Sequence, residues 1–154
     1  MAYAGTAREA VARLKFGGAL RLAEVMAAQM AANAPTQLIR GRTVVPVPLH
    51  RSRRRARGFD QSQRLAGAVA RRLELPVTRC LVRQGPASRQ VGAGRRTRLS
   101  RGRLEVAAAR QAPARVVLVD DVHTTGATFD ACARALRCAG AASVVCLAYA
   151  RALR

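Results

Sequence analysis

Residues 116–128 constrain the fold of this chain more than any other stretch, because they combine a strand, a turn and the start of a helix. The stretch begins with four apolar residues, 116–119, a run that is typical of a strand covered on both faces, as in a parallel sheet. Asp120 and Asp121 follow directly. Ligands of open α/β sheets bind beyond the carboxyl ends of the strands. The stretch therefore predicts an α/β fold with a binding site at the end of this strand.

The residues after the strand predict a ligand with two chemically different ends. N–H groups and the positive dipole end at a helix N-terminus favour phosphate, which two neighbouring carboxylates would repel. The conflict disappears if Asp120 and Asp121 accept hydrogen bonds from sugar hydroxyls at the other end of the ligand. The phosphate would then be held by the hydroxyls and backbone N–H groups of Thr124, Thr125, Gly126, Ala127 and Thr128. A phosphorylated ribose fits, and so does a divalent metal near the carboxylates.

The alternative is a buried strand followed by an Asx-type turn and a helix cap, without any ligand. Single Asp or Thr residues at such a turn usually have this local role. Here two acids are adjacent, and the chain has only eight acidic residues in total. This scarcity, together with the Thr-Thr-Gly-Ala-Thr turn, favours the ligand interpretation.

Length and composition predict one domain that spans residues 1–154. A chain of 154 residues can bury a substantial core, but aromatic residues make up only 3%, so the core must be built from Val, Leu and Ala. No apolar run approaches the roughly 20 residues of a membrane span. The N-terminus lacks the continuous apolar segment of a secretory signal, and we therefore expect a cytoplasmic protein.

The formal net charge of +20 leaves nucleic acid binding open. Lys15 is the only lysine among the 28 basic residues, and this abundance of Arg and Ala is typical of a GC-rich genome. Part of the charge is explained by that composition, but the scarcity of acidic residues is not.

The four cysteines predict reduced thiols rather than a metal site. They contain no Cys-x-x-Cys pair, and no histidine is near enough in sequence to complete a zinc knuckle. Cys132 falls on the apolar face of a predicted helix and Cys146 inside an apolar strand, so we expect both in the core.

The first half of the chain predicts a helical N-terminal part over residues 1–40 and a strand over 43–47. Five arginines then occupy seven positions, 51–57. They predict either a solvated basic loop or, because they follow a strand, a second anion site at the same sheet edge, for pyrophosphate or a nucleic acid backbone.

Asp60 and Gln63 resemble a capping box, which predicts that Asp60 is the N-cap of the helix that follows.

Residues 83–103 lack apolar periodicity and predict a mobile basic loop, either a lid over an anionic substrate or a disordered segment. A helix over 127–139 and a strand over 143–149 complete a right-handed βαβ unit with the strand at 116.

Residues 117–128, Val-Leu-Val-Asp-Asp-Val-His-Thr-Thr-Gly-Ala-Thr, resemble the phosphoribosyl pyrophosphate motif of type I phosphoribosyltransferases. Residues 45–50, Val-Pro-Val-Pro-Leu-His, and 57–61, Arg-Gly-Phe-Asp-Gln, resemble one branch of them, the ComF family, named for bacterial competence for DNA uptake. The resemblance implies a type I phosphoribosyltransferase fold, in which helices flank a mainly parallel sheet with a flexible loop and a small hood.

The resemblance also implies roles for individual residues. Asp120 and Asp121 would meet the ribose hydroxyls, and residues 124–128 the 5-phosphate. His50, Arg53 and Arg57 would lie on the pyrophosphate side, and residues 83–103 on the flexible loop. Mg²⁺ would accompany phosphoribosyl pyrophosphate as ligand or substrate.

This sequence departs from the family pattern in three places. The four-cysteine zinc module of many members is not recognised, Asp60 stands where Asn is usual, and the Asn-containing segment after the flexible loop is not found. Two functions therefore remain open. One is transfer of a phosphoribosyl group to an acceptor that the sequence does not identify. The other is a non-catalytic competence factor that binds single-stranded DNA and partners in the DNA-uptake machinery.

Overall fold

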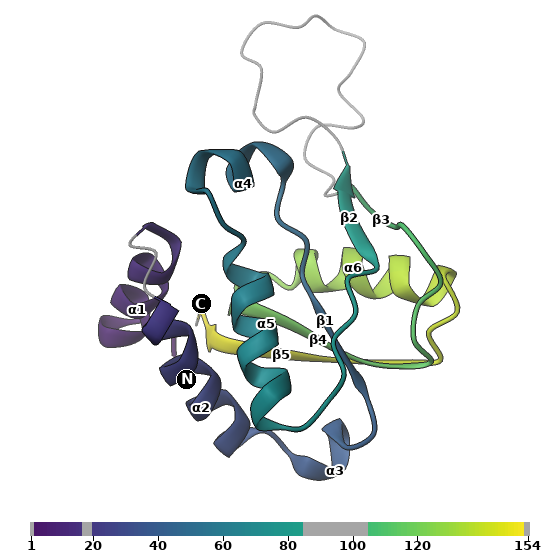
Figure 1. Cartoon of the computed structure of the whole chain (residues 1–154), viewed down its shortest axis with the longest axis horizontal. Helices are drawn as coiled ribbons and strands as arrows, with labels where there is room; N and C mark the ends of the chain where they lie inside the picture. The colour runs from purple at the N-terminus through teal and green to yellow at the C-terminus, as the bar shows by residue number, and fades with distance from the viewer. Residues whose placement is uncertain (1, 17–19, 85–104, 153–154) are drawn as a thin grey trace, which may run out of the picture.

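The computed structural model describes residues 2–16, 20–84 and 105–152, and its centre is a parallel sheet of three strands. These strands are β1 (Thr43–Pro46), β4 (Arg115–His123) and β5 (Ser143–Arg151), arranged in the order β1-β4-β5. A separate antiparallel hairpin is formed by β2 (Leu81–Gln84) and β3 (Glu105–Ala108) (Figure 1). The predicted α/β fold with a mainly parallel sheet is confirmed.

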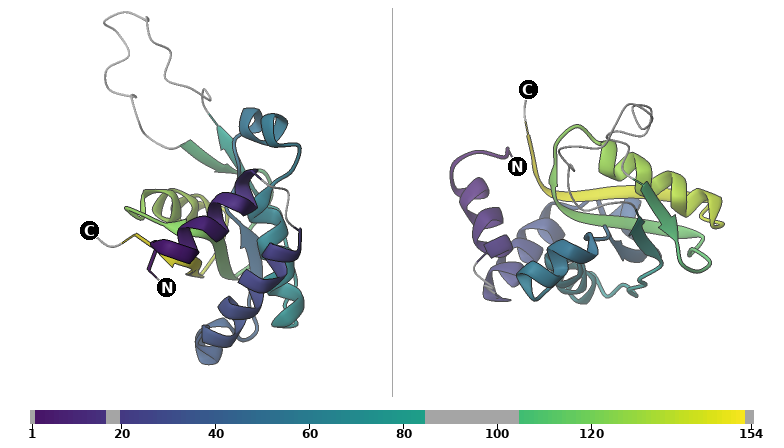
Figure 2. Two further views of the ribbon diagram at one scale, coloured as in Figure 1. Left: turned by 90° about the vertical axis from the view of Figure 1, so that its left-hand side faces the viewer. Right: turned by 90° about the horizontal axis from the view of Figure 1, so that it is seen from above.

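Helices cover both faces of the parallel sheet. Figure 2 shows the C-terminal helix on one face and the N-terminal helices on the other. The six helices of the described residues are α1 (Gly5–Phe16), α2 (Leu20–Asn33), α3 (Thr36–Ile39), α4 (Arg51–Arg57), α5 (Gln61–Arg72) and α6 (Ala127–Cys138). None of them is long and apolar enough to cross a membrane.

Strand β4 joins the two halves of the core. Val117 and Val119 face the cluster built by α2 and α5, whereas Val116 and Leu118 face the cluster built by α6. All four side chains are fully buried. Since successive residues of a strand point to opposite faces, an unbroken apolar run is what a doubly covered strand requires. The prediction for residues 116–119 is confirmed.

Helix α5 begins at the cap that the sequence predicts. The Asp60 carboxylate accepts a hydrogen bond from the Gln63 backbone N–H at 3.1 Å. Leu65 and Val69 of the same helix are fully buried against α2 and the sheet. The cap therefore fixes where the helix starts, and the apolar face fixes how it packs.

Two predictions about secondary structure are wrong, one about residues 51–57 and one about the end of β4. Residues 51–57 form α4 instead of a loop, because His50 caps its start by accepting from the Ser52 N–H (3.2 Å) and Gly58 ends it at φ 73°. The strand predicted to end at 119 continues to His123, because β5 is equally long and pairs with it up to Arg151. Of the predicted loop at 83–103, only the first two residues are described, and they belong to β2.

The prediction that both Cys132 and Cys146 lie in the core is half wrong. Cys132 is fully buried, and burial, with a smaller effect of the Asp120 charge, raises its pKa to about 12. Cys146 is exposed, because β5 is the edge strand of the described sheet and its apolar run is covered only in part.

We predict that Leu65→Ala lowers the free energy of unfolding by about 2–5 kcal/mol, because truncating a fully buried leucine leaves a cavity in the core. Urea denaturation followed by circular dichroism measures this loss. The matched control is Leu38→Ala in α3, a side chain that is 50% exposed, with an expected change within about 0.5 kcal/mol. Equal losses in the two variants would contradict the assignment of the core.

Candidate functional site

Strand β1 ends beside Val119 of β4, and the last residues of β4 extend past it at the edge of the sheet where the predicted site residues lie. Pro46 at the end of β1 is in register with Val119, and the Val47 N–H donates to the Val119 carbonyl at 3.0 Å. The segment from β1 into α4 and the segment from β4 into α6 therefore leave the sheet next to each other. This is the position where ligands of open α/β sheets bind.

The two adjacent acids have different environments. Asp120 is half-buried, and its Oδ1 accepts hydrogen bonds from the Ser62 hydroxyl (3.1 Å) and the Asp121 N–H (2.9 Å). Asp121 is only 4% exposed. As consecutive residues of an extended strand, they direct their side chains to opposite faces. Of the two carboxylates, Asp120 is thus the one more open to a ligand.

Ser62 is a site residue that the sequence did not reveal. It lies in the first turn of α5, is 3% exposed, and reaches Asp120 across 58 positions of sequence. A serine in a first helical turn is usually explained by local capping. No signal in the sequence connects it with a strand so far away.

The turn at residues 124–126 and the start of α6 form the predicted phosphate cradle. Thr124 and Thr125 are exposed, and Gly126 is the N-cap in the left-handed conformation at φ 85°. Gly126 supplies no side-chain cap, and the Thr125 hydroxyl accepts from the Ala127 N–H only at 3.4 Å. The first N–H groups of α6 are therefore available for an anion, with the dipole of a 12-residue helix behind them.

His123 packs close to this turn and was not among the predicted site residues. Its ring stacks on Phe129 of α6, with centroids 5.8 Å apart and planes at 21°. Its Nε2 would lie 3.2 Å from a Cβ at position 126, so a side chain there would be crowded by the ring in addition to being strained by the positive φ. His123 Nδ1 is buried and has no hydrogen-bond partner among the described residues.

The basic residues predicted on the pyrophosphate side follow β1. His50 is the N-cap of α4, and its Nδ1 lies 2.9 Å from the Ser52 hydroxyl. Arg53 and Arg57 belong to α4, but their side chains lie outside the described part of the structure. Figure 1 shows α4 beyond the end of β1, so the helix is at the predicted edge of the sheet.

The architecture is the type I phosphoribosyltransferase fold: helices flank a parallel sheet, and its central strand leads through a threonine- and glycine-containing turn into a helix. No family model and no curated protein matches the sequence. Comparison with solved structures supplies the assignment of the fold.

Two solved structures share this fold with TM-scores above 0.5. An allosteric regulatory enzyme of purine biosynthesis superposes with a TM-score of 0.56 and 24% identity, covering 82% of this chain and 25% of that one. Glutamine phosphoribosylpyrophosphate amidotransferase from B. subtilis gives 0.55 and 23%, covering 80% and 25%. This chain thus corresponds to about a quarter of either protein.

We predict that Gly126→Ala destabilises the protein more than Gly41→Ala does. Both glycines have positive φ (85° and 67°), so both variants carry the left-handed penalty of roughly 1–2 kcal/mol. Only at position 126 does the new Cβ press on a ring, that of His123, whereas at 41 it meets the end of Arg115 at 3.6 Å. Urea denaturation of both variants measures the difference, and equal losses would show that His123 does not restrict the turn.

Proposed function

We propose that this chain is a ComF-like phosphoribosyltransferase that binds phosphoribosyl pyrophosphate with Mg²⁺ and transfers the phosphoribosyl group to an acceptor. One observation carries the proposal. Asp120 and Asp121 lie in the part of β4 that extends past the end of β1, and the strand then continues through the turn at 124–126 into the N-terminus of α6, which has no side-chain cap from Gly126. A pair of carboxylates next to free helix N–H groups suits a ligand with hydroxyls at one end and a phosphate at the other.

Each part of the ligand has its own set of residues in this proposal. The 5-phosphate is bound by the cradle of Thr124, Thr125, Gly126, Ala127 and Thr128. The ribose hydroxyls donate to Asp120 and Asp121, and Ser62 holds the Asp120 carboxylate in position. The pyrophosphate lies toward α4, where His50, Arg53 and Arg57 follow β1.

The donor set fits Mg²⁺ as a companion of the substrate. No group of three or more His, Cys, Asp or Glu in the described ranges could hold a metal ion without help. Mg²⁺ is usually held by one or two carboxylates together with substrate phosphates, and Asp120 and Asp121 supply the carboxylates. When bound, the ion offsets the charge that gathers on the pyrophosphate as it leaves.

Catalysis in this site would rest on positioning and electrostatics. A nucleophile forms a bond to the anomeric carbon while the bond from that carbon to pyrophosphate breaks. Positive charge develops on the ribose ring, and in this proposal the Asp120 and Asp121 carboxylates stabilise it. The cradle holds the 5-phosphate in place throughout the displacement, which makes the reaction effectively intramolecular.

We predict that the double variant Asp120→Asn with Asp121→Asn binds phosphoribosyl pyrophosphate at least about tenfold more weakly, because a hydrogen bond to a charged group is worth about 1.5–3 kcal/mol. Isothermal titration calorimetry in the presence of Mg²⁺ measures the affinity. Absence of binding by the native chain, or equal affinity in the variant, would refute the site.

The matched control for this experiment is Asp130→Asn. Asp130 is an exposed acid of α6 that lies outside the proposed contacts, and it undergoes the same chemical change. We expect its affinity to be unchanged or slightly higher, since a negative charge near the cradle is removed. The melting temperature of each variant shows whether a loss of binding results from unfolding instead.

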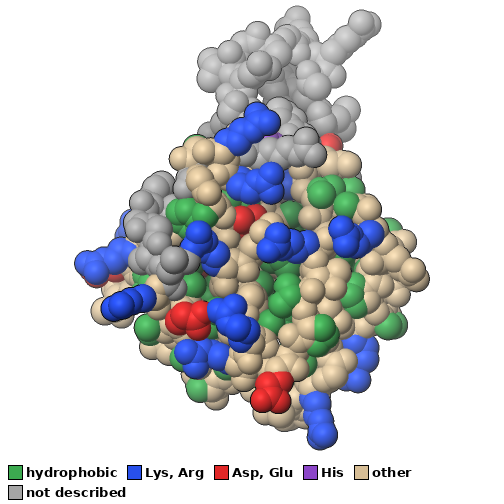
Figure 3. Space-filling model, in the orientation of Figure 1, with side chains coloured by type: hydrophobic (Ala, Val, Ile, Leu, Met, Phe, Trp, Pro, Cys, Tyr) green, Lys and Arg blue, Asp and Glu red, His purple; other side chains and the backbone are tan. Residues whose placement is uncertain are grey.

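A second candidate function is that of a competence factor that binds single-stranded DNA and acts with the DNA-uptake machinery. The observation that favours it is the net charge of +20. Figure 3 shows many basic side chains on the face that carries α4 and α5, and Arg54, Arg64 and Arg79 are among the exposed ones. Such a surface attracts a phosphate backbone of any sequence.

We predict for this candidate that the affinity for a fluorescein-labelled single-stranded oligonucleotide falls steeply with salt. Each phosphate neutralised contributes about −0.7 to the slope of log K against log[salt]. Fluorescence anisotropy measures this slope. The titrations are made at salt concentrations between about 50 and 200 mM. An oligonucleotide that does not bind even at the lowest salt concentration would exclude this function.

A further inference from the structure

An open groove of about 800 Å³ lies between β3 and the second half of α6. It is lined by residues 105–111 on one side and by Ala131, Arg134, Ala135, Cys138 and Ala139 on the other. None of the described residues of the cradle or of α4 lines it. At one end the Ala112 N–H donates to the Ala139 carbonyl at 2.9 Å, which joins the two sides. Because these two residues precede β4 and β5, this end lies at the opposite edge of the sheet from Asp120.

The side of the groove formed by β3 is a backbone edge. Strand β2 pairs with the other edge of β3, and none of its four residues lines the groove. The consecutive residues 105–111 all line it, whereas the side chains on one face of a strand would contribute only every second residue. The groove therefore runs along the edge of β3 that β2 leaves free.

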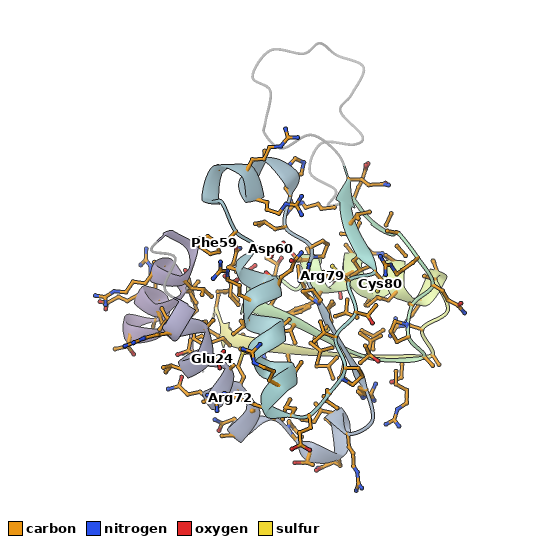
Figure 4. All side chains as sticks on the ribbon, in the orientation of Figure 1. Glu24, Phe59, Asp60, Arg72, Arg79 and Cys80 are labelled. Atoms are coloured by element: carbon orange, nitrogen blue, oxygen red, sulfur yellow. The ribbon has the colours of Figure 1, made fainter. Side chains whose placement is uncertain are left out.

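The backbone groups of Val106 and Ala108 point toward this groove. The Ala109 N–H donates to the carbonyl of Cys80, which lies at the base of the hairpin (Figure 4), at 2.7 Å. In an antiparallel pair, residues that bond to the partner strand alternate with residues whose N–H and C=O point away from it. Ala107 therefore faces β2, and Val106 and Ala108 face away. Within the described ranges, no backbone hydrogen bond connects these two residues with a further segment.

The side of the groove formed by α6 is shallow and mostly apolar. Ala131, Ala135 and Ala139 are four residues apart and so lie along one face of the helix. The side chains of Val106 and Ala108 pack against the core cluster on this side of the sheet. Because alanine side chains are short, the helix leaves room for another backbone next to β3.

Two arginines that line the groove have no ionic partner in the described part of the chain. Arg110 and Arg134 are exposed, and neither side chain has an ion pair or hydrogen bond to a described residue. With Glu105 as the acid among the described lining residues, two arginines and one glutamate leave a formal charge of +1. A second copy of this chain, with its charge of +20, would be repelled, whereas an acidic segment would be attracted.

We propose that this groove is a docking site for an extended, acidic segment of another protein, which adds a strand to the free edge of β3. Main-chain hydrogen bonds to Val106 and Ala108 supply affinity, as in other cases of strand addition. Apolar side chains of the added strand rest on the alanines of α6. Acidic side chains alternate with them and pair with Arg110 or Arg134. The groove would have this role whether or not the chain transfers a phosphoribosyl group.

The test is a titration of the ¹⁵N-labelled full chain with the peptide acetyl-Val-Glu-Val-Glu-Val-Ala-amide, followed by amide NMR signals. A strand rises about 3.3 Å per residue, so a peptide of about six residues covers the edge of β3. The Ala108 signal should shift in a saturable way. Its hydrogen exchange should slow about tenfold when the peptide is at roughly ten times its Kd, because only the free fraction exchanges. The absence of a saturable shift at Ala108 would overturn the proposal.

Two altered peptides separate charge from backbone pairing. Lysine in place of both glutamates should weaken binding at least about tenfold, because each charge-assisted hydrogen bond is worth about 1.5–3 kcal/mol. Methylation of the valine nitrogens should abolish binding, because residues opposite Val106 and Ala108 have their side chains on the same face and their N–H groups toward β3. Methylation of the glutamate nitrogens, which point away from β3, is the matched control. Equal binding of all these peptides would refute strand addition.

Two variants of the chain test the same contacts from the other side. Ala108→Pro removes an outward N–H but no bond of the β2–β3 ladder, so binding should be lost while the melting temperature stays nearly unchanged. Arg110→Gln should weaken binding about tenfold, the loss of roughly one charge-assisted hydrogen bond. Arg137→Gln, an exposed arginine of α6 outside the groove, is the matched control and should bind like the native chain. Native-like binding by Ala108→Pro would show that β3 is not the docking edge.

Hydrogen exchange of the free chain shows whether the edge is already occupied. In the monomer, Ala108 should exchange at least about tenfold faster than Ala107, whose N–H lies in the ladder with β2. Equal protection of the two amides in the monomer would show that another segment of this chain pairs with β3. Protection of Ala108 that rises with protein concentration would show that a second copy does. Either result would overturn the proposal, whereas the calorimetric affinity for phosphoribosyl pyrophosphate tests the proposed function separately.

Discussion

The rest of the structure depends on the burial of β4 between two helical layers. Its residues 116–119 are fully buried, alternately against α2 and α5 and against α6. Complete burial of one such side chain contributes about 1.5–3 kcal/mol, so this strand supplies a large part of the net stability of a domain. Parallel pairing with β1 then places the carboxyl ends of both strands at one edge. The position of the candidate site is a consequence of this packing.

The two adjacent acids are positioned by the sheet itself, because both lie within β4. Asp120 and Asp121 are fixed by ladder pairing rather than by a loop, since Asp120 is in register with Ala148 of β5. Ser62 connects Asp120 to the first turn of α5, and Asp60 caps the same helix. The start of α5 therefore carries both the hydroxyl that donates to Asp120 and the carboxylate that caps the helix.

The features that the sequence predicted are those with a local or periodic cause. The apolar run of β4, the cap at Asp60 and the apolar face of α6 each follow from neighbouring residues. Helix α4 escaped prediction because its arginines form no apolar face, and only its caps at His50 and Gly58 define it. The length of β4, the exposure of Cys146 and the contact from Ser62 to Asp120 depend on partners distant in sequence, which periodicity does not reveal.

Asp60 combines two physical roles: its side chain caps α5, and its charge interacts with neighbouring arginines. Asp and Asn cap helices equally well, so the structure of α5 does not require a carboxylate at this position. A carboxylate that is 8% exposed carries a desolvation cost that an amide avoids, and Arg54 and Arg79 offset part of it. The charge of Asp60 therefore acts on the arginines as well as on the N-terminus of the helix. In a chain with eight acidic residues, this places one of the few negative charges within electrostatic reach of Arg54 and Arg79.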